Sequence, residues 1–249
     1  AQLLTAMAPR PLSAAELLDA ASACRGRSAA EKGIYLAALG MPGQSFGACA
    51  ALPIGARDAA IVALRQAMFG DRIELSAKCP RCEARLDVAM ASAAMLAIAG
   101  SAGSEAREIV IDGDRFTIRP ADSADLAAIG WIPDMDEARA ELARRCLVPA
   151  EGAELPPWLE ETEIDAIGAA MAEIDPAGDP FVALHCPECD CEWDAPVDIA
   201  GVLAGEIEGA ADALLDEIHL LAQAYHWSEA AILALGPERR RAYLARLPQ

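Results

Sequence analysis

Two short cysteine pairs are the residues of this chain best suited to chemistry. They are Cys79-Pro80-Arg81-Cys82 and Cys186-Pro187-Glu188-Cys189, and each forms a Cys-Pro-x-Cys motif. Thiolates two residues apart can bind one tetrahedral ion from the same side, so two such turns supply four sulfur ligands. A shell closed by four protein ligands leaves no position for water or substrate. The sequence therefore predicts a structural Zn²⁺ bound by Cys79, Cys82, Cys186 and Cys189.

Two further side chains near the second motif are alternative ligands. Cys191 supplies a fifth thiol, and His185 directly precedes Cys186. Side chains alternate between the two faces of a strand, which argues against His185 pointing to the same side as Cys186. The residue after each second cysteine is Glu83 or Asp190, where zinc knuckles often have glycine because the backbone turns left-handed there.

A thiol redox enzyme is the main chemical alternative for the two motifs. A reactive Cys-x-x-Cys pair needs a setting such as a helix N-terminus, which lowers the pKa of a thiol. Strand-like sequences flank both pairs here, at 73–77 and 85–88 for the first and at 181–185 and 192–197 for the second. This context favours metal binding over redox chemistry and over two unconnected pairs of reduced thiols.

The composition indicates a helical and acidic protein. Apolar residues make up 54% of the 249 positions, much of that alanine, and aromatic residues only 4%. The formal net charge of −19 opposes binding to nucleic acid or to an anionic membrane. The cationic run Arg239-Arg240-Arg241 lies beside Glu238 near the end of a predicted helix, where it complements the helix dipole. We therefore expect no nucleic-acid partner.

Signatures of common enzyme classes and of membrane insertion are missing from the sequence. It has three histidines and contains no His-Glu-x-x-His, Gly-x-Ser-x-Gly, phosphate-loop or dinucleotide-binding motif. No apolar run reaches the roughly 18 residues of a membrane span. The first residues show no cationic segment followed by an apolar one, as a secretory signal would. We expect a cytoplasmic protein that is not an enzyme, with no small-molecule substrate and no membrane span.

Hydrophobic periodicity and turn signals predict an α+β fold that is mostly helical. Ser13-Ala14-Ala15-Glu16 is a capping box at a helix start, and Asp112-Gly113 is a hairpin turn. The two Cys-Pro-x-Cys hairpins are expected to form a zinc-ribbon-like unit. The expected parts are an N-terminal helical segment at 1–70, paired zinc-knuckle hairpins at 71–90 and 180–200, an inserted hairpin with helices at 105–179, and C-terminal helices at 201–249.

The order of short motifs in the C-terminal half resembles that of a known family. The second cysteine motif and Trp193 are followed by Glu217–Ala222, Ala224–Glu229, Ile232–Leu235 and Arg239–Leu244. This order, together with the paired knuckles, is similar to zinc-knuckle baseplate proteins encoded with contractile phage tails and related contractile injection systems. The sequence departs from that family at Glu83 and Asp190, at Gly236 where serine is commoner, and at His226 where glycine is commoner.

The resemblance implies a structural subunit of a baseplate that joins hub, spike and wedge components. Such a protein would be cytoplasmic during assembly and would then belong to a phage tail or injection-system particle. From the net charge of −19, we expect the acidic surface to contact basic patches of neighbouring subunits. An assembly chaperone that leaves the finished particle is one alternative, and a thiol redox enzyme using Cys-x-x-Cys is an alternative of a different class.

Overall fold

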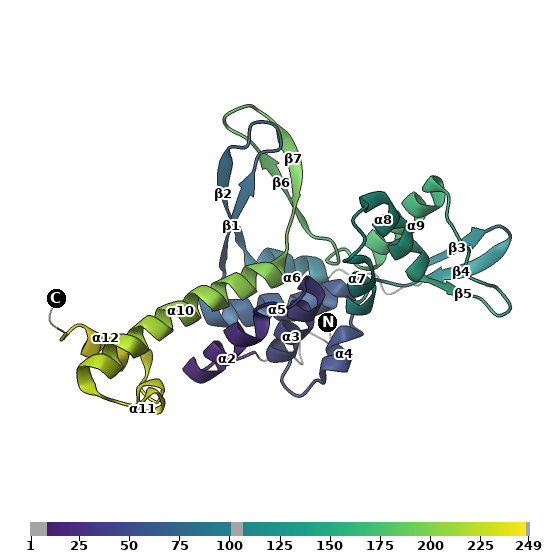
Figure 1. Cartoon of the computed structure of the whole chain (residues 1–249). Coiled ribbons are helices and arrows are strands. Elements are labelled where there is room, and N and C mark those ends of the chain that lie inside the picture. The colour runs from purple at the N-terminus through teal and green to yellow at the C-terminus, as the bar shows by residue number, and fades with distance from the viewer. Residues whose placement is uncertain (1–8, 101–106, 248–249) are drawn as a thin grey trace. The chain divides into compact units, whose positions relative to one another are not determined.

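The structure, a computed structural model, describes residues 9–100 and 107–247. Within these ranges the fold is α+β as predicted, with many helices and three small antiparallel sheets (Figure 1). The chain divides into two compact units, one consisting mainly of Ser28–Ala200 and the other of Pro11–Arg27 with Gly201–Gln249. No helix within the described ranges is long and apolar enough to cross a membrane. The first eight residues, on which the expectation of no secretory signal depends, lie outside the described residues.

The larger unit begins with the predicted N-terminal helices. These are α3 (Ala29–Gly40), α4 (Phe46–Ala50) and α5 (Ile54–Phe69), and α6 (Ser92–Gly100) follows the first hairpin. Ser28 and Glu31 form a capping box at the start of α3. Ile61 and Leu64, on the apolar face of α5, are fully buried. Gly40 allows α3 to approach α5, because a Cβ there would lie 2.5 Å from the Ala60 carbonyl oxygen.

A buried polar cluster joins α3 and α5 to α7 (Ser123–Ile129). Arg57 donates to Asp58 Oδ1 at 2.7 Å and to Ser123 Oγ at 3.2 Å. A Cβ on Gly33 would lie 2.8 Å from the guanidinium carbon of Arg57, so only glycine leaves room for this side chain. Burial, reinforced by the charges of Asp198 and Asp175, raises the pKa of Asp58 to about 6 although Arg57 opposes the shift.

Both predicted knuckle hairpins are present. The first pairs β1 (Arg72–Lys78) with β2 (Arg85–Ala91), and the second pairs β6 (Phe181–His185) with β7 (Glu192–Pro196). Each forms its own two-stranded sheet. Exposed side chains alternate with half-buried or buried ones along all four strands, so each hairpin has one covered apolar face.

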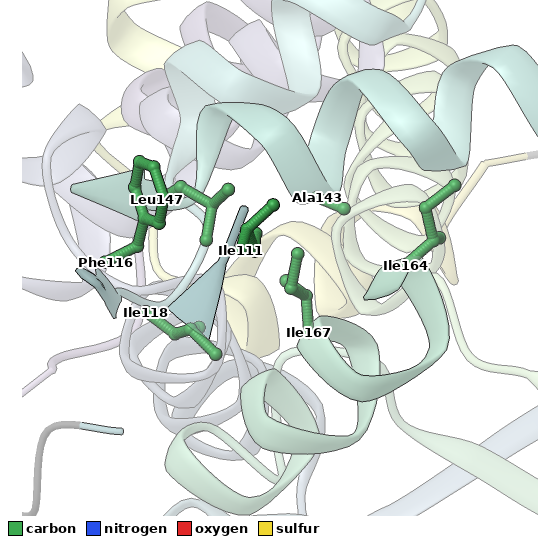
Figure 2. Close-up of a cluster of buried hydrophobic side chains, with 7 residues drawn as sticks. All are labelled: Ile111, Phe116, Ile118, Ala143, Leu147, Ile164 and Ile167. Carbon is green, nitrogen blue, oxygen red and sulfur yellow. The ribbon is translucent and has the colours of Figure 1, made fainter. Parts of the chain in front are cut away.

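The chain between the hairpins forms a sheet covered by helices. Strands β3 (Arg107–Ile111), β4 (Asp114–Ile118) and β5 (Leu147–Pro149) pair in that order, and α8 (Met135–Arg145) and α9 (Glu161–Ile174) pack near them. Asp112 (φ 52°) and Gly113 (φ 92°) make the predicted left-handed hairpin turn between β3 and β4. Figure 2 shows the core of this part, the buried side chains Ile111, Phe116, Ile118, Ala143, Leu147, Ile164 and Ile167.

A buried carboxylate connects α7 to the end of β4 and to the end of α8. Asp125, whose side chain is 1% exposed, accepts hydrogen bonds from both terminal nitrogens of Arg119 at 2.6 and 3.0 Å. It also accepts from Arg145 Nε at 3.0 Å and from the Asp122 backbone N–H at 3.1 Å. Burial raises the pKa of Asp125, but the hydrogen bonds and charges of Arg119 and Arg145 prevail and lower it overall.

The smaller unit is helical. It contains α2 (Ala14–Cys24), most of α10 (Ile199–Tyr225), α11 (Glu229–Leu233) and α12 (Pro237–Leu244). The predicted capping box of Ser13 and Glu16 is present at the start of α2. Leu214, Ile218 and Leu221 of α10 form a buried cluster with Ile232 of α11. These helices confirm the helical pattern predicted for the end of the chain.

The role expected for the cationic run of α12 is wrong for its central residue. Arg240 is only 7% exposed, donates from Nε to Glu217 Oε2 at 2.8 Å and also donates to the Leu235 carbonyl at 2.8 Å. Only Arg241 lies in the last turn of the helix, where it complements the dipole. Arg240 therefore acts as a buried partner of Glu217 instead of a surface charge.

Candidate metal centre

The two cysteine turns have the same backbone structure. In the first knuckle (residues 79–84), Cys79 N–H donates to the Ala84 carbonyl and Glu83 N–H donates to the Cys79 carbonyl, both at 2.9 Å. In the second knuckle (residues 186–191), the N–H groups of Cys186 and Asp190 make the equivalent bonds, to the carbonyls of Cys191 and Cys186, also at 2.9 Å. Both turns therefore present their two thiols in the same way.

Both knuckles require a left-handed residue after the second cysteine. Glu83 has φ 59° and Asp190 has φ 53°. Side chains with a Cβ are disfavoured there, and aspartate tolerates the conformation better than glutamate. The sequence prediction of a left-handed turn without glycine is confirmed at both positions.

The two knuckles bring all four predicted cysteines together. The Sγ atoms of Cys79, Cys82, Cys186 and Cys189, here called the four-thiol cluster, lie within 4.8 Å of one another. Two contacts between the hairpins, Cys79 to Cys189 and Cys82 to Cys186, are 3.6 Å long. A tetrahedral zinc with Zn–S bonds of about 2.3 Å has S–S edges of about 3.8 Å. The distances fit a single shared metal ion and are far longer than the roughly 2.05 Å of a disulfide.

The thiols of the cluster differ in exposure and acidity. Cys79 and Cys186 are buried, Cys189 is half-buried and Cys82 is exposed. Burial raises the pKa of Cys79, but hydrogen bonds from the backbone N–H groups of Cys82 and Arg81 and from neighbouring thiols lower it overall, to about 6. Burial and the other three thiols raise the pKa of Cys189 to about 12. A divalent cation would favour the thiolate form of all four, so its binding would release protons.

Apolar and polar side chains support the cluster from both hairpins. Leu86 of β2 and Trp193 of β7 pack against the buried cysteines. Arg81 of the first knuckle donates to the Cys189 carbonyl of the second at 3.1 Å. The contact of Arg81 was missed from the sequence, because nothing in a single Cys-Pro-Arg-Cys motif shows where its arginine points.

The alternative ligands His185 and Cys191 lie outside the four-thiol cluster. His185 is exposed, and its Nε2 lies 3.3 Å from Asp190 Oδ1, as expected from strand alternation. Cys191 is 9% exposed and belongs to the same buried cluster as Cys79 and Cys186. Among the described residues, the four cysteines are the one group of three or more His, Cys, Asp or Glu side chains spaced to hold a metal ion.

Comparison of the chain with models of protein families, with curated proteins and with solved structures finds no match. The four-thiol cluster and the order of sequence motifs are therefore the features from which function is inferred.

Proposed function

We propose that this chain is a structural protein whose two knuckle hairpins are joined by one Zn²⁺ bound to Cys79, Cys82, Cys186 and Cys189. The observation that carries the proposal is the meeting of four thiols from segments 104 and 110 positions apart within 4.8 Å. Soft thiolate ligands in a tetrahedral set suit zinc, and also iron in iron–sulfur proteins. Four protein ligands leave no open coordination position, which favours a structural role over a catalytic one.

Zinc in this position would supply free energy for folding. Each hairpin has two strands, and an isolated two-stranded hairpin is marginally stable in water. A metal bound by both turns would add its binding free energy to the folded state, since the unfolded chain has no preformed site. The cysteines would supply the ligands, Leu86 and Trp193 would cover them, and Arg81 would link the second turn to the first.

We further propose that the protein is a baseplate subunit of a contractile tail or injection system, joining hub, spike and wedge components. Support comes from the order of motifs in the C-terminal half and from the paired knuckles. The net charge of −19 supports contacts with basic protein surfaces. Because exposed charges are screened by salt, assembly with neighbouring subunits should weaken as the ionic strength rises.

Elemental analysis combined with thiol counting tests the metal site. We expect about one zinc per chain and slow alkylation of the four thiols until a chelator is added. Cys79→Ser should abolish metal binding and lower the melting temperature strongly, whereas Cys49→Ala, a buried cysteine of α4, should leave the metal content unchanged. A metal-free protein with rapidly alkylated Cys79 would favour the thiol redox enzyme instead. Iron in place of zinc would correct the metal and retain the site.

Purified particles test the baseplate assignment separately. A structural subunit should be present at a fixed ratio to sheath and hub proteins in finished particles. An assembly chaperone should be present in immature assemblies and missing from finished ones. Assembly that proceeds equally at low and high salt would contradict the proposed charge contacts while leaving the metal site unaffected.

A further inference from the structure

The fifth cysteine of the hairpins lies on the same face as the metal ligands. Strands β6 and β7 pair His185 with Glu192, and the next pair along the ladder is Cys186 with Cys191, joined by the 2.9 Å hydrogen bond between Cys186 N–H and the Cys191 carbonyl. Residues directly opposite each other in antiparallel strands share one face, with Cβ atoms roughly 5 Å apart. Burial agrees, because His185 and Glu192 are exposed and both cysteines are buried.

The first knuckle has no such fifth thiol. Its equivalent position is Ala84, whose carbonyl accepts from Cys79 as that of Cys191 accepts from Cys186. Alanine at this position shows that the knuckle backbone forms without a cysteine there. Cys191 is therefore not needed for the turn itself.

The backbone of Cys191 lies beside the thiol of Cys189. Cys189 packs against the buried group that Cys79, Cys186 and Cys191 form, and its thiol accepts a hydrogen bond from the Cys191 backbone N–H. Cys82, the exposed thiol of the cluster, comes from the other knuckle. The thiol of Cys191 can therefore turn toward the position that Cys189 occupies, two residues before it in the same turn.

We propose that Cys191 is a reserve ligand that replaces Cys189 in the metal shell when Cys189 is alkylated, oxidised or mutated. This inference rests on the proposed metal site. Cys189 is half-buried and so more open to reagents than the buried Cys79 and Cys186. The second knuckle then tolerates loss of its outer ligand, and the first knuckle does not.

Paired alanine variants of the full-length protein test this proposal. Metal content is measured by native mass spectrometry, affinity by competition with a chromophoric chelator, and the number of thiolates by the visible spectrum of the Co²⁺ form. Cys189→Ala should retain one metal with a four-thiolate cobalt spectrum, and its loss of affinity should be at least roughly tenfold smaller than that of Cys82→Ala. The double variant Cys189→Ala/Cys191→Ala should bind as weakly as Cys82→Ala, and Cys191→Ala alone should bind like the wild type.

Several results would overturn the reserve role. Equal loss of affinity in Cys189→Ala and Cys82→Ala, or a Cys189→Ala protein that does not fold while Cys191→Ala does, would show that Cys191 gives no rescue. Weak binding by Cys191→Ala alone would make Cys191 a resident ligand. A wild-type protein that binds neither zinc nor cobalt would refute the proposed metal site as well, so the two failures are distinguishable.

Discussion

Asp125→Asn should lower the free energy of unfolding of the protein by about 2 to 4 kcal/mol. The substitution keeps the shape of the side chain and removes its charge. Oδ1 of Asp125 accepts from Arg119 and Arg145, and Oδ2 accepts from Arg119 and the Asp122 N–H. Either orientation of an asparagine amide would therefore turn its NH₂ group toward an N–H donor of Arg119.

The expected magnitude follows from the burial of the carboxylate and the partial exposure of its partners. Breaking a buried ion pair by removing one partner costs about 3 to 5 kcal/mol. The side chains of Arg119 and Arg145 are 35% and 32% exposed, so water can solvate part of the charge left behind. This exposure reduces the expected loss to the lower part of that range or just below it.

Urea unfolding followed by far-UV circular dichroism measures this loss. Asp165→Asn is the matched control, because Asp165 also pairs with an arginine, Arg139, but its side chain is 61% exposed. Exposed pairs contribute at most about 1 kcal/mol. A loss of less than about 1 kcal/mol for Asp125→Asn, or one equal to that of Asp165→Asn, would refute the reasoning. Because the pKa of Asp125 is lowered in the folded state, its contribution should be present at neutral pH and disappear as the pH falls below the unfolded value of 3.8.

Three further predictions concern other residues. Glu83→Gly should raise the free energy of unfolding by about 0.5 to 1 kcal/mol, because glycine adopts the left-handed conformation of this position without a steric cost. Glu83→Ala keeps the Cβ and should not raise it. Thermal unfolding of both variants measures the difference. Because the pKa of Asp58 is raised to about 6, the folded state binds this proton more tightly than the unfolded state does. Stability should therefore rise by about 1 kcal/mol from about pH 7.5 to about pH 5.5, and a difference that persists unchanged in Asp58→Asn would contradict this origin. Arg240→Met should destabilise the smaller unit by about 2 kcal/mol, as measured by hydrogen exchange of α12, and Arg239→Met should have an effect below about 0.5 kcal/mol.

Features encoded by local sequence were predictable. The capping box of Ser13 and the Asp112-Gly113 turn are set by residues within three positions of each other, and both are present. The meeting of the four cysteines was also predictable, although they are distant in sequence. Repetition of one motif in two similar strand contexts indicated that the two cysteine pairs lie together.

Features that depend on distant partners could not be predicted. Strand β5 has three residues and ends in Pro149, so its sequence shows no alternation of apolar and polar side chains. It is a strand because it pairs with the edge of β4. Arg240 lies among other arginines in a polar helix, and nothing local indicates that it turns inward to Glu217. The same holds for Asp125, which belongs to the capping box of α7 and also binds two arginines from outside that helix.

The four-thiol cluster also closes a long loop of the chain. The contacting cysteines are 104 and 110 positions apart, and the closed loop contains β3, β4, β5, α8 and α9 with a buried core of their own. The entropy lost on closing a flexible loop grows with the logarithm of its length, by only about 0.6 kcal/mol for each doubling. Lengthening, shortening or replacing the insert therefore changes the closure free energy little. The insert can therefore change in length or sequence at little cost to the meeting of the two hairpins.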